Sequence, residues 1–128
     1  MEEAARKWFK QALHDLEMAE QNIYIGGYDV ASFLAHQAVE KALKGALILQ
    51  GASVPKTHYL EELAKLLSLP ESLEDAVRDL SPDYMLSRYP DVAETVPYEE
   101  YNEAIAWRKV SLAYEVIEFL KVSYGGLE

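Results

Sequence analysis

The segment Arg88-Tyr89-Pro90-Asp91 combines side chains that can bind a phosphate and stack on a nucleobase. An arginine guanidinium can donate two parallel hydrogen bonds to a phosphate, and a tyrosine ring can stack on a base. The alternative is a structural turn, in which Pro90 fixes the backbone, Asp91 caps the turn and Arg88 pairs with a carboxylate of another helix. We take Arg88, Tyr89 and Asp91 as candidate residues for binding a nucleotide, another anion or a protein partner.

Further tyrosines lie close to this segment: Tyr84 shortly before it, and Tyr98 and Tyr101 shortly after it. Exposed tyrosines beside an arginine suit base stacking or a protein interface. Alternatively, their rings close one end of a hydrophobic core while their hydroxyl groups stay in water. On the first interpretation Tyr84 joins the candidate binding residues.

Lys56 and His58 flank Thr57, where a helix is expected to begin. The free backbone N–H groups at a helix N-terminus attract anions, and two cationic side chains add to that attraction. In the alternative interpretation Thr57 is only an N-cap and His58 is an ordinary surface residue. Lys56 and His58 are further candidates for binding an anion or a partner.

His36 and Glu40 are four residues apart and therefore share one face of a helix. A histidine paired with a carboxylate inside a bundle is a general-base arrangement, whereas the same pair on a helix surface only stabilises the helix slightly. His36 and His58 are kept as catalytic alternatives to the binding interpretation. The three histidines show no metal-binding spacing and cysteine is absent, so neither a metal nor another cofactor is expected.

The chain has 128 residues and a formal net charge of −10. Its length suits one domain with a hydrophobic core. Its acidity repels a phosphate backbone at long range, although a local basic patch or a basic partner can reverse the field. The longest uncharged stretch, Gly45 to Pro55, is far shorter than the ~20 apolar residues of a membrane span. We expect a cytoplasmic protein outside the membrane, with a single domain over residues 1–128.

Hydrophobic residues recur at helical spacing, and no segment shows the sustained alternation of a strand. Gly26-Gly27 and Gly51 are expected to end helices, and Asp29 and Thr57 to begin them as N-caps. We predict an all-α, up-and-down helical bundle of three long helices plus one or two short helices. The predicted helices are Glu3–Ile25, Asp29–Gln50, a short one through Leu60–Leu67, another through Leu73–Leu80, and Tyr98–Ser123, with an irregular stretch at Ser81–Pro97.

Four ordered features resemble the HEPN domain family (higher eukaryotes and prokaryotes nucleotide-binding) and span nearly the whole chain. They are Gly27-Tyr28-Asp29 before Ala31-Ser32-Phe33, the run His36-Gln37-Ala38-Val39-Glu40-Lys41-Ala42-Leu43-Lys44, Gly51 followed by Thr57-His58-Tyr59-Leu60, and Arg88-Tyr89-Pro90-Asp91. The resemblance implies an up-and-down bundle with a short extra helix, and a homodimer. It also implies a toxin–antitoxin setting, because many prokaryotic members are encoded beside a minimal nucleotidyltransferase.

A subset of the family are metal-independent endoribonucleases, which use an arginine followed four to six residues later by a histidine, usually paired across a dimer interface. In this chain no histidine follows an arginine at that distance; Arg6 lies eight residues before His14. We therefore predict a module that binds a nucleotide, RNA or a nucleotidyltransferase partner and is not catalytic by itself. The alternatives are a degenerate endoribonuclease toxin, with Arg88 near His58 or His36 in space, and a purely structural oligomerisation protein.

Overall fold

The computed structural model describes residues 2–125, and every regular element within them is helical. Three long helices and three short α-helices are present, together with one turn of 3₁₀-helix, which confirms the predicted all-α bundle. One short helix more than expected is found, since α5 lies inside the stretch predicted to be irregular. The elements are α1 (Glu2–Tyr24), α2 (Tyr28–Leu49), α3 (Leu60–Leu67), α4 (Glu71–Leu80), α5 (Asp83–Leu86), η1 (Pro97–Glu100) and α6 (Glu103–Ser123).

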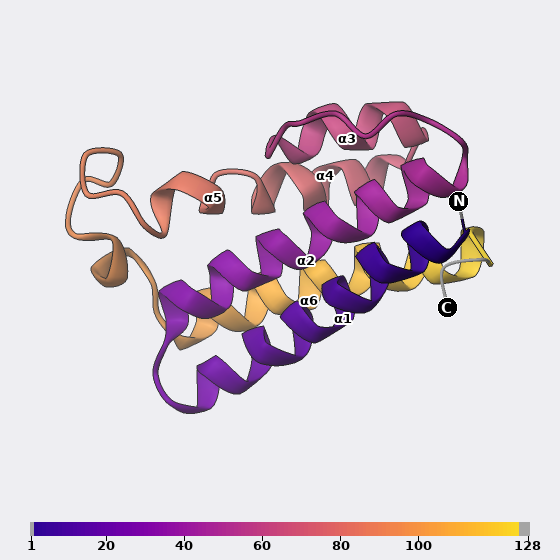
Figure 1. Cartoon of the computed structure of the whole chain (residues 1–128). Coiled ribbons are helices and arrows are strands. Elements are labelled where there is room, and N and C mark those ends of the chain that lie inside the picture. The colour runs from indigo at the N-terminus through magenta and orange to yellow at the C-terminus, as the bar shows by residue number, and fades with distance from the viewer. Residues whose placement is uncertain (1, 126–128) are drawn as a thin grey trace.

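The long helices α1, α2 and α6 run side by side, while α3 and α4 cover α2 and α6 on one side (Figure 1). The chain then continues through α5 and a loop at one end of the bundle before it enters α6 (Figure 1). Helix α2 packs against α1, α6, α3, α4 and α5. It is therefore the central helix, on which the other elements are assembled. None of the described helices is both long and apolar enough to cross a membrane.

Small side chains let the neighbouring helices approach α2 closely. Ala31, Ala35, Ala38 and Ala42 are completely buried along it, and short side chains reduce the distance at which helix axes can cross. Larger residues from the neighbours complete the core, including Phe9 of α1 and Ile117 of α6. This face of small residues is thus a packing surface inside the bundle.

Glycines end two helices as expected, but the predicted N-caps are wrong. Gly26 and Gly51 have φ values of +80° and +81°, a left-handed conformation that glycine adopts without steric cost. The N-cap of α2 is Gly27 instead of Asp29, which lies in the first helical turn. Thr57 accepts a hydrogen bond from the backbone N–H of Tyr59 at 3.1 Å, so it closes a local turn and Tyr59 becomes the N-cap of α3.

The last helix begins at Glu103, five residues later than predicted. The side chain of Asn102 accepts a hydrogen bond from the backbone N–H of Ile105 at 2.8 Å, which is N-cap geometry. Residues 97–100 form the short 3₁₀-helix η1 instead. Glu100 accepts hydrogen bonds from the backbone N–H groups of Glu94 and Thr95 at 3.1 and 3.2 Å, so this loop is tied to η1.

A buried charged network joins α4, α5 and α6; we call it the Lys109 network. The Nζ atom of Lys109 lies 2.8 Å from Oδ1 of Asp79 and 2.8 Å from Oδ2 of Asp83. The Tyr101 hydroxyl donates to the other carboxylate oxygen of Asp83. Burial raises the pKa of Asp83 although Lys109 opposes this, and burial together with Asp83 raises the pKa of Tyr101. For Asp79, burial is outweighed by Lys109 and Arg108, which lower its pKa.

Replacing Lys109 with methionine is expected to lower the free energy of unfolding by about 3–5 kcal/mol, because Asp83 would keep a buried charge without its cation. Urea unfolding followed by circular dichroism measures the change. The matched control is Arg108→Met, since Arg108 is exposed and lies 3.5 Å from Asp79, farther than Lys109 does. The loss of unfolding free energy in this variant should stay below about 1 kcal/mol. Equal losses in the two variants would contradict a special role for the buried lysine.

Candidate functional site

One face of α2 carries the residues from which the candidate site is built. Phe33, His36, Glu40 and Lys44 follow one another at steps of three, four and four residues, which places them along a single line on the helix. The loop before α3, the short helix α5 and the turn after α5 lie over this line. We call the assembly the Glu40 site; its members are Phe33, His36, Glu40, Lys44, His58, Tyr84 and Arg88.

The carboxylate of Glu40 is buried and fully engaged. One oxygen accepts a hydrogen bond from Nζ of Lys44 at 3.0 Å, and both oxygens lie 3.1 Å from Nδ1 of His58. Nδ1 of His36 is 4.0 Å away. A buried carboxylate is stable only when cations and donors surround it. The pairing of Glu40 with Lys44 and His36 therefore forms a polar cluster inside the protein, not a pair on the helix surface.

His36 is completely enclosed and fixes the loop that carries His58. Its Nε2 atom is 3.1 Å from the backbone carbonyl oxygen of His58; because a carbonyl only accepts, Nε2 carries a proton. Burial lowers the pKa of His36, although Glu40 and the hydrogen bonds to Gln37 and His58 act in the opposite direction. The ring has no exposed surface through which to contact a ligand.

His58, Tyr84 and Arg88 lie against one another at the surface of the site. The rings of His58 and Tyr84 are stacked, with centroids 4.4 Å apart and planes inclined by 12°. The guanidinium carbon of Arg88 is 4.4 Å from the centre of the Tyr84 ring, 4.5 Å from Phe33 and 4.7 Å from Tyr89. The structure thus brings together four of the residues singled out in the sequence: His58, Tyr84, Arg88 and Tyr89.

Arg88 is exposed and is held by aromatic rings instead of a carboxylate. Its Nε atom donates to the backbone oxygen of Tyr84 at 2.9 Å, and within residues 2–125 no carboxylate lies within ion-pair distance of it. Contacts with aromatic faces attract a guanidinium electrostatically without neutralising its charge. The alternative interpretation, in which Arg88 pairs with a carboxylate of another helix, is therefore wrong, and the terminal nitrogens of Arg88 make no hydrogen bond with a described residue.

The remaining candidates are arranged differently. Lys56 is exposed and Asp91 is exposed, and the side chain of neither makes a hydrogen bond or ion pair with a described residue. Asp91 therefore does not cap the turn, which is closed instead by backbone bonds such as Val92 N–H to the Tyr89 oxygen, at 3.1 Å. The tyrosines divide: Tyr98 is exposed, and Tyr101 is buried in the Lys109 network.

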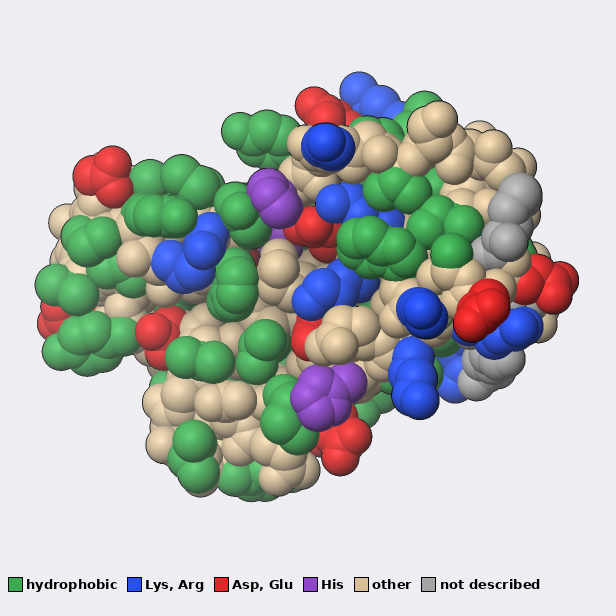
Figure 2. All heavy atoms as spheres, viewed as in Figure 1, with side chains coloured by type: hydrophobic (Ala, Val, Ile, Leu, Met, Phe, Trp, Pro, Cys, Tyr) green, Lys and Arg blue, Asp and Glu red, His purple; other side chains and the backbone are tan. Residues whose placement is uncertain are grey.

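Sequence reasoning missed Phe33 and Lys44 as parts of the site, and it missed the link between Glu40 and His58. The spacing of residues 33, 36, 40 and 44 was the available signal, because it aligns an aromatic ring with three ionisable groups. Figure 2 shows charged side chains gathered near the centre of the displayed face, beside a largely hydrophobic end formed by α5 and the following loop. In the part of the chain described, no group of three acidic, histidine or cysteine side chains could hold a metal ion.

The structure combines three long helices, the short helices that cover them and a line of polar residues on α2. This combination defines a class of helical domain. The HEPN domain model matches residues 5–123, and the chain belongs to the HEPN domain family.

Individual relatives resemble the chain over almost its full length. TT1696 from Thermus thermophilus is 33% identical, with a TM-score of 0.85 over 92% of this chain and 96% of that one. ST0689, described as an archaeal HEPN homologue, is 36% identical, with a TM-score of 0.83 over 94% and 97%. In sequence the chain is 28% identical to "Putative toxin MJ1304" of Methanocaldococcus jannaschii, over 94% of this chain and 91% of that protein.

We expect the His36 ring to titrate below pH 6.5, its usual value, because burial disfavours the imidazolium form. The folded state then takes up this proton less readily than the unfolded chain, so stability is lost as the pH falls below about 6.5. NMR titration of the ring measures the midpoint directly. Urea unfolding at about pH 7.5 and about pH 5.5 should show a smaller loss of stability in His36→Gln than in the wild type. A midpoint at or above 6.5 would contradict the assignment.

Proposed function

We propose that the protein binds the phosphate and base of a nucleotide or of RNA at the exposed edge of the Glu40 site. The observation that carries this proposal is Arg88, an exposed guanidinium that has no carboxylate partner among residues 2–125 of a strongly acidic chain. Its position is fixed by Phe33, Tyr84 and Tyr89. A guanidinium held in place loses little conformational entropy when it binds a phosphate.

Aromatic side chains beside Arg88 provide the complementary contact. Tyr89 is 40% exposed and adjoins the guanidinium, so its ring is available to stack on a ribose or on a base of RNA. The side chain of His58 is 51% exposed at the other end of the row. Lys56, two residues before His58, adds a positive charge near the same loop. Asp91 makes no contact with the site and has no assigned role in this proposal.

We further propose that the protein works in a toxin–antitoxin pair with a minimal nucleotidyltransferase, as a homodimer in the cytoplasm. Support comes from membership of the HEPN family and from the similar protein of Methanocaldococcus jannaschii, whose name contains the word toxin. The exposed face of α6 favours an assembly, since Tyr114, Phe119 and Val122 line an apolar hollow there. By itself the protein is proposed to be non-catalytic, because the arginine-to-histidine spacing of the family's ribonucleases is absent.

Metal-independent RNA cleavage is the second candidate function, and one observation favours it. The Glu40 carboxylate holds Nδ1 of His58, while Nε2 of His58 makes no hydrogen bond with a described residue. In this arrangement Nε2 would accept the proton of a ribose 2′-hydroxyl, whose oxygen attacks the adjacent phosphorus to form a 2′,3′-cyclic phosphate, while the bond to the 5′-oxygen breaks and that oxygen takes a proton from water. Arg88 would stabilise the charge on the phosphate oxygens.

Replacing Arg88 with alanine should weaken the binding of AMP and of short single-stranded RNA about tenfold or more, because charge-assisted hydrogen bonds to phosphate are lost. Arg88→Lys should give an intermediate affinity, since it keeps the charge but not the fork. Isothermal titration calorimetry measures both. Arg108→Ala, which removes an exposed arginine of α6, is the control. The proposal fails if Arg88→Ala binds like the wild type, or if it unfolds in circular dichroism.

RNA cleavage is tested with the purified wild type, alone and freed from any partner, in the presence of a metal chelator. If the second candidate is correct, His58→Ala abolishes cleavage and Glu40→Gln reduces it, because the imidazole loses the carboxylate that orients it. A stable, folded wild-type protein that leaves RNA intact in both states excludes this function and leaves the binding role as proposed.

A further inference from the structure

A groove runs between α3 and α4 and ends at Tyr84, which is the one residue that it shares with the Glu40 site. One hollow, of about 340 Å³, lies between the two helices. A second hollow, of about 360 Å³, is lined by Tyr84, Met85 and Val92, among others. Glu61 and Arg78 line both hollows, so the two adjoin at this pair of residues. Tyr84 also contacts Arg88, which places the groove next to the proposed phosphate-binding group.

Glu61 carries a carboxylate oxygen without a donor. Its Oε1 atom is shielded from solvent and has no hydrogen-bond partner in residues 2–125. Desolvating a carboxylate oxygen is costly when no donor replaces the lost water. A rotation of the Glu61 side chain would bring this oxygen to an N–H group of a ligand in the groove and remove the cost, so Glu61 is the residue of the groove that lacks a hydrogen-bond donor.

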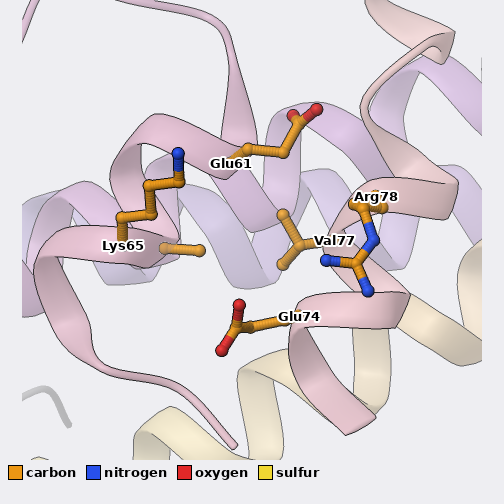
Figure 3. Close-up of a pocket in the computed structure, with 6 residues that line it drawn as sticks. Glu61, Lys65, Glu74, Val77 and Arg78 are labelled. Carbon is orange, nitrogen blue, oxygen red and sulfur yellow. The ribbon is translucent and has the colours of Figure 1, made fainter. Parts of the chain in front are cut away.

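The charges of the groove balance one another. Figure 3 shows Glu61 and Lys65 on α3 and Glu74 and Arg78 on α4, with Val77 between the two helices. Among the described residues, these four charged side chains form no ion pair across the groove, since Arg78 pairs with the exposed Asp75 instead. A cationic ligand would be repelled by the two basic side chains of the groove, and an anionic ligand would be repelled by the two acidic side chains. A neutral ligand with a donor and an acceptor on one edge, and a flat apolar face against Val77, fits this arrangement best.

We propose that this groove receives the base of the nucleotide whose phosphate is bound by Arg88, and that it selects bases with an exocyclic amino group. The amino group would donate to Oε1 of Glu61, and Arg78 would donate to the neighbouring ring acceptor. Uracil and hypoxanthine present a carbonyl oxygen where cytosine and adenine present an amino group. That oxygen would face the Glu61 carboxylate, which cannot donate to it. This inference rests on the proposed nucleotide-binding function.

Two matched pairs of nucleotides test the selection, because the members of each differ only at one edge of the base: one has an amino group beside a ring acceptor, the other a carbonyl oxygen beside a ring N–H group. CMP is compared with UMP, and AMP with IMP, by isothermal titration calorimetry on the full chain. The wild type is expected to bind the amino-bearing member of at least one pair about tenfold more tightly. Glu61→Gln should reduce that preference to within about threefold, since the amide of glutamine can donate to a carbonyl oxygen.

Glu62→Gln is the control, because Glu62 is exposed on the same turn of α3, does not line the groove and loses the same charge; it should keep the wild-type preference. Equal affinities for both members of each pair, or a preference that persists in Glu61→Gln, overturn the base-selecting groove while nucleotide binding at Arg88 stands. If no nucleotide binds the wild type, the proposed binding function is wrong, and the proposed selection of bases by the groove is wrong as well.

Discussion

The buried carboxylate of Glu40 is the charge on which the rest of the candidate site depends. It lies on the central helix and is shared by Lys44 of the same helix and by His58 of a distant loop. Because a buried charge must be compensated, the loop that carries His58 is held where its imidazole can reach Glu40. The stack of His58 on Tyr84, and of Tyr84 with Arg88, follows from that position. A single internal charge thus determines how the outer surface is arranged.

The second anchor of this surface is the Lys109 network, which acts from the opposite side. Asp83 is the first residue of α5 and is bound by Lys109 and Tyr101, while Tyr84 follows it directly in the chain. A helix of four residues has little stability of its own. Its position is therefore set by Asp83 on the inner side and by the Tyr84 stack on the outer side. Two buried ionic groups, one on α2 and one on α6, hold the same short helix in place.

Helical periodicity was sufficient to predict the bundle, because the three long helices bury continuous apolar stripes such as the alanines of α2. It could not predict α5 or η1, since four residues are too few to show a period. The predictions of the N-caps were wrong for a related reason. Several residues near the start of a helix can act as the N-cap, and the geometry of the preceding loop decides which of them does. Within the candidate site, Arg88 and Tyr89 could be proposed from the sequence, because their side chains suggest phosphate binding and stacking without knowledge of the fold. The sequence could not predict the contact of Glu40 with His58 or that of Phe33 with Arg88, because each joins parts of the chain that only tertiary packing brings together.

The aromatic cradle of Arg88 has a consequence for the response of the protein to ionic strength. A chain with a net charge of −10 repels a polyanion at long range, and dissolved salt screens that repulsion within about 10 Å at 0.1 M. The same salt competes for the direct contact between the guanidinium and a phosphate. The two effects have opposite signs, and the contacts of Arg88 with Phe33, Tyr84 and Tyr89 hold the guanidinium in position within the protein. The proposed recognition of a phosphate at this surface is therefore expected to depend less on salt concentration than that of a protein relying on a broad basic patch.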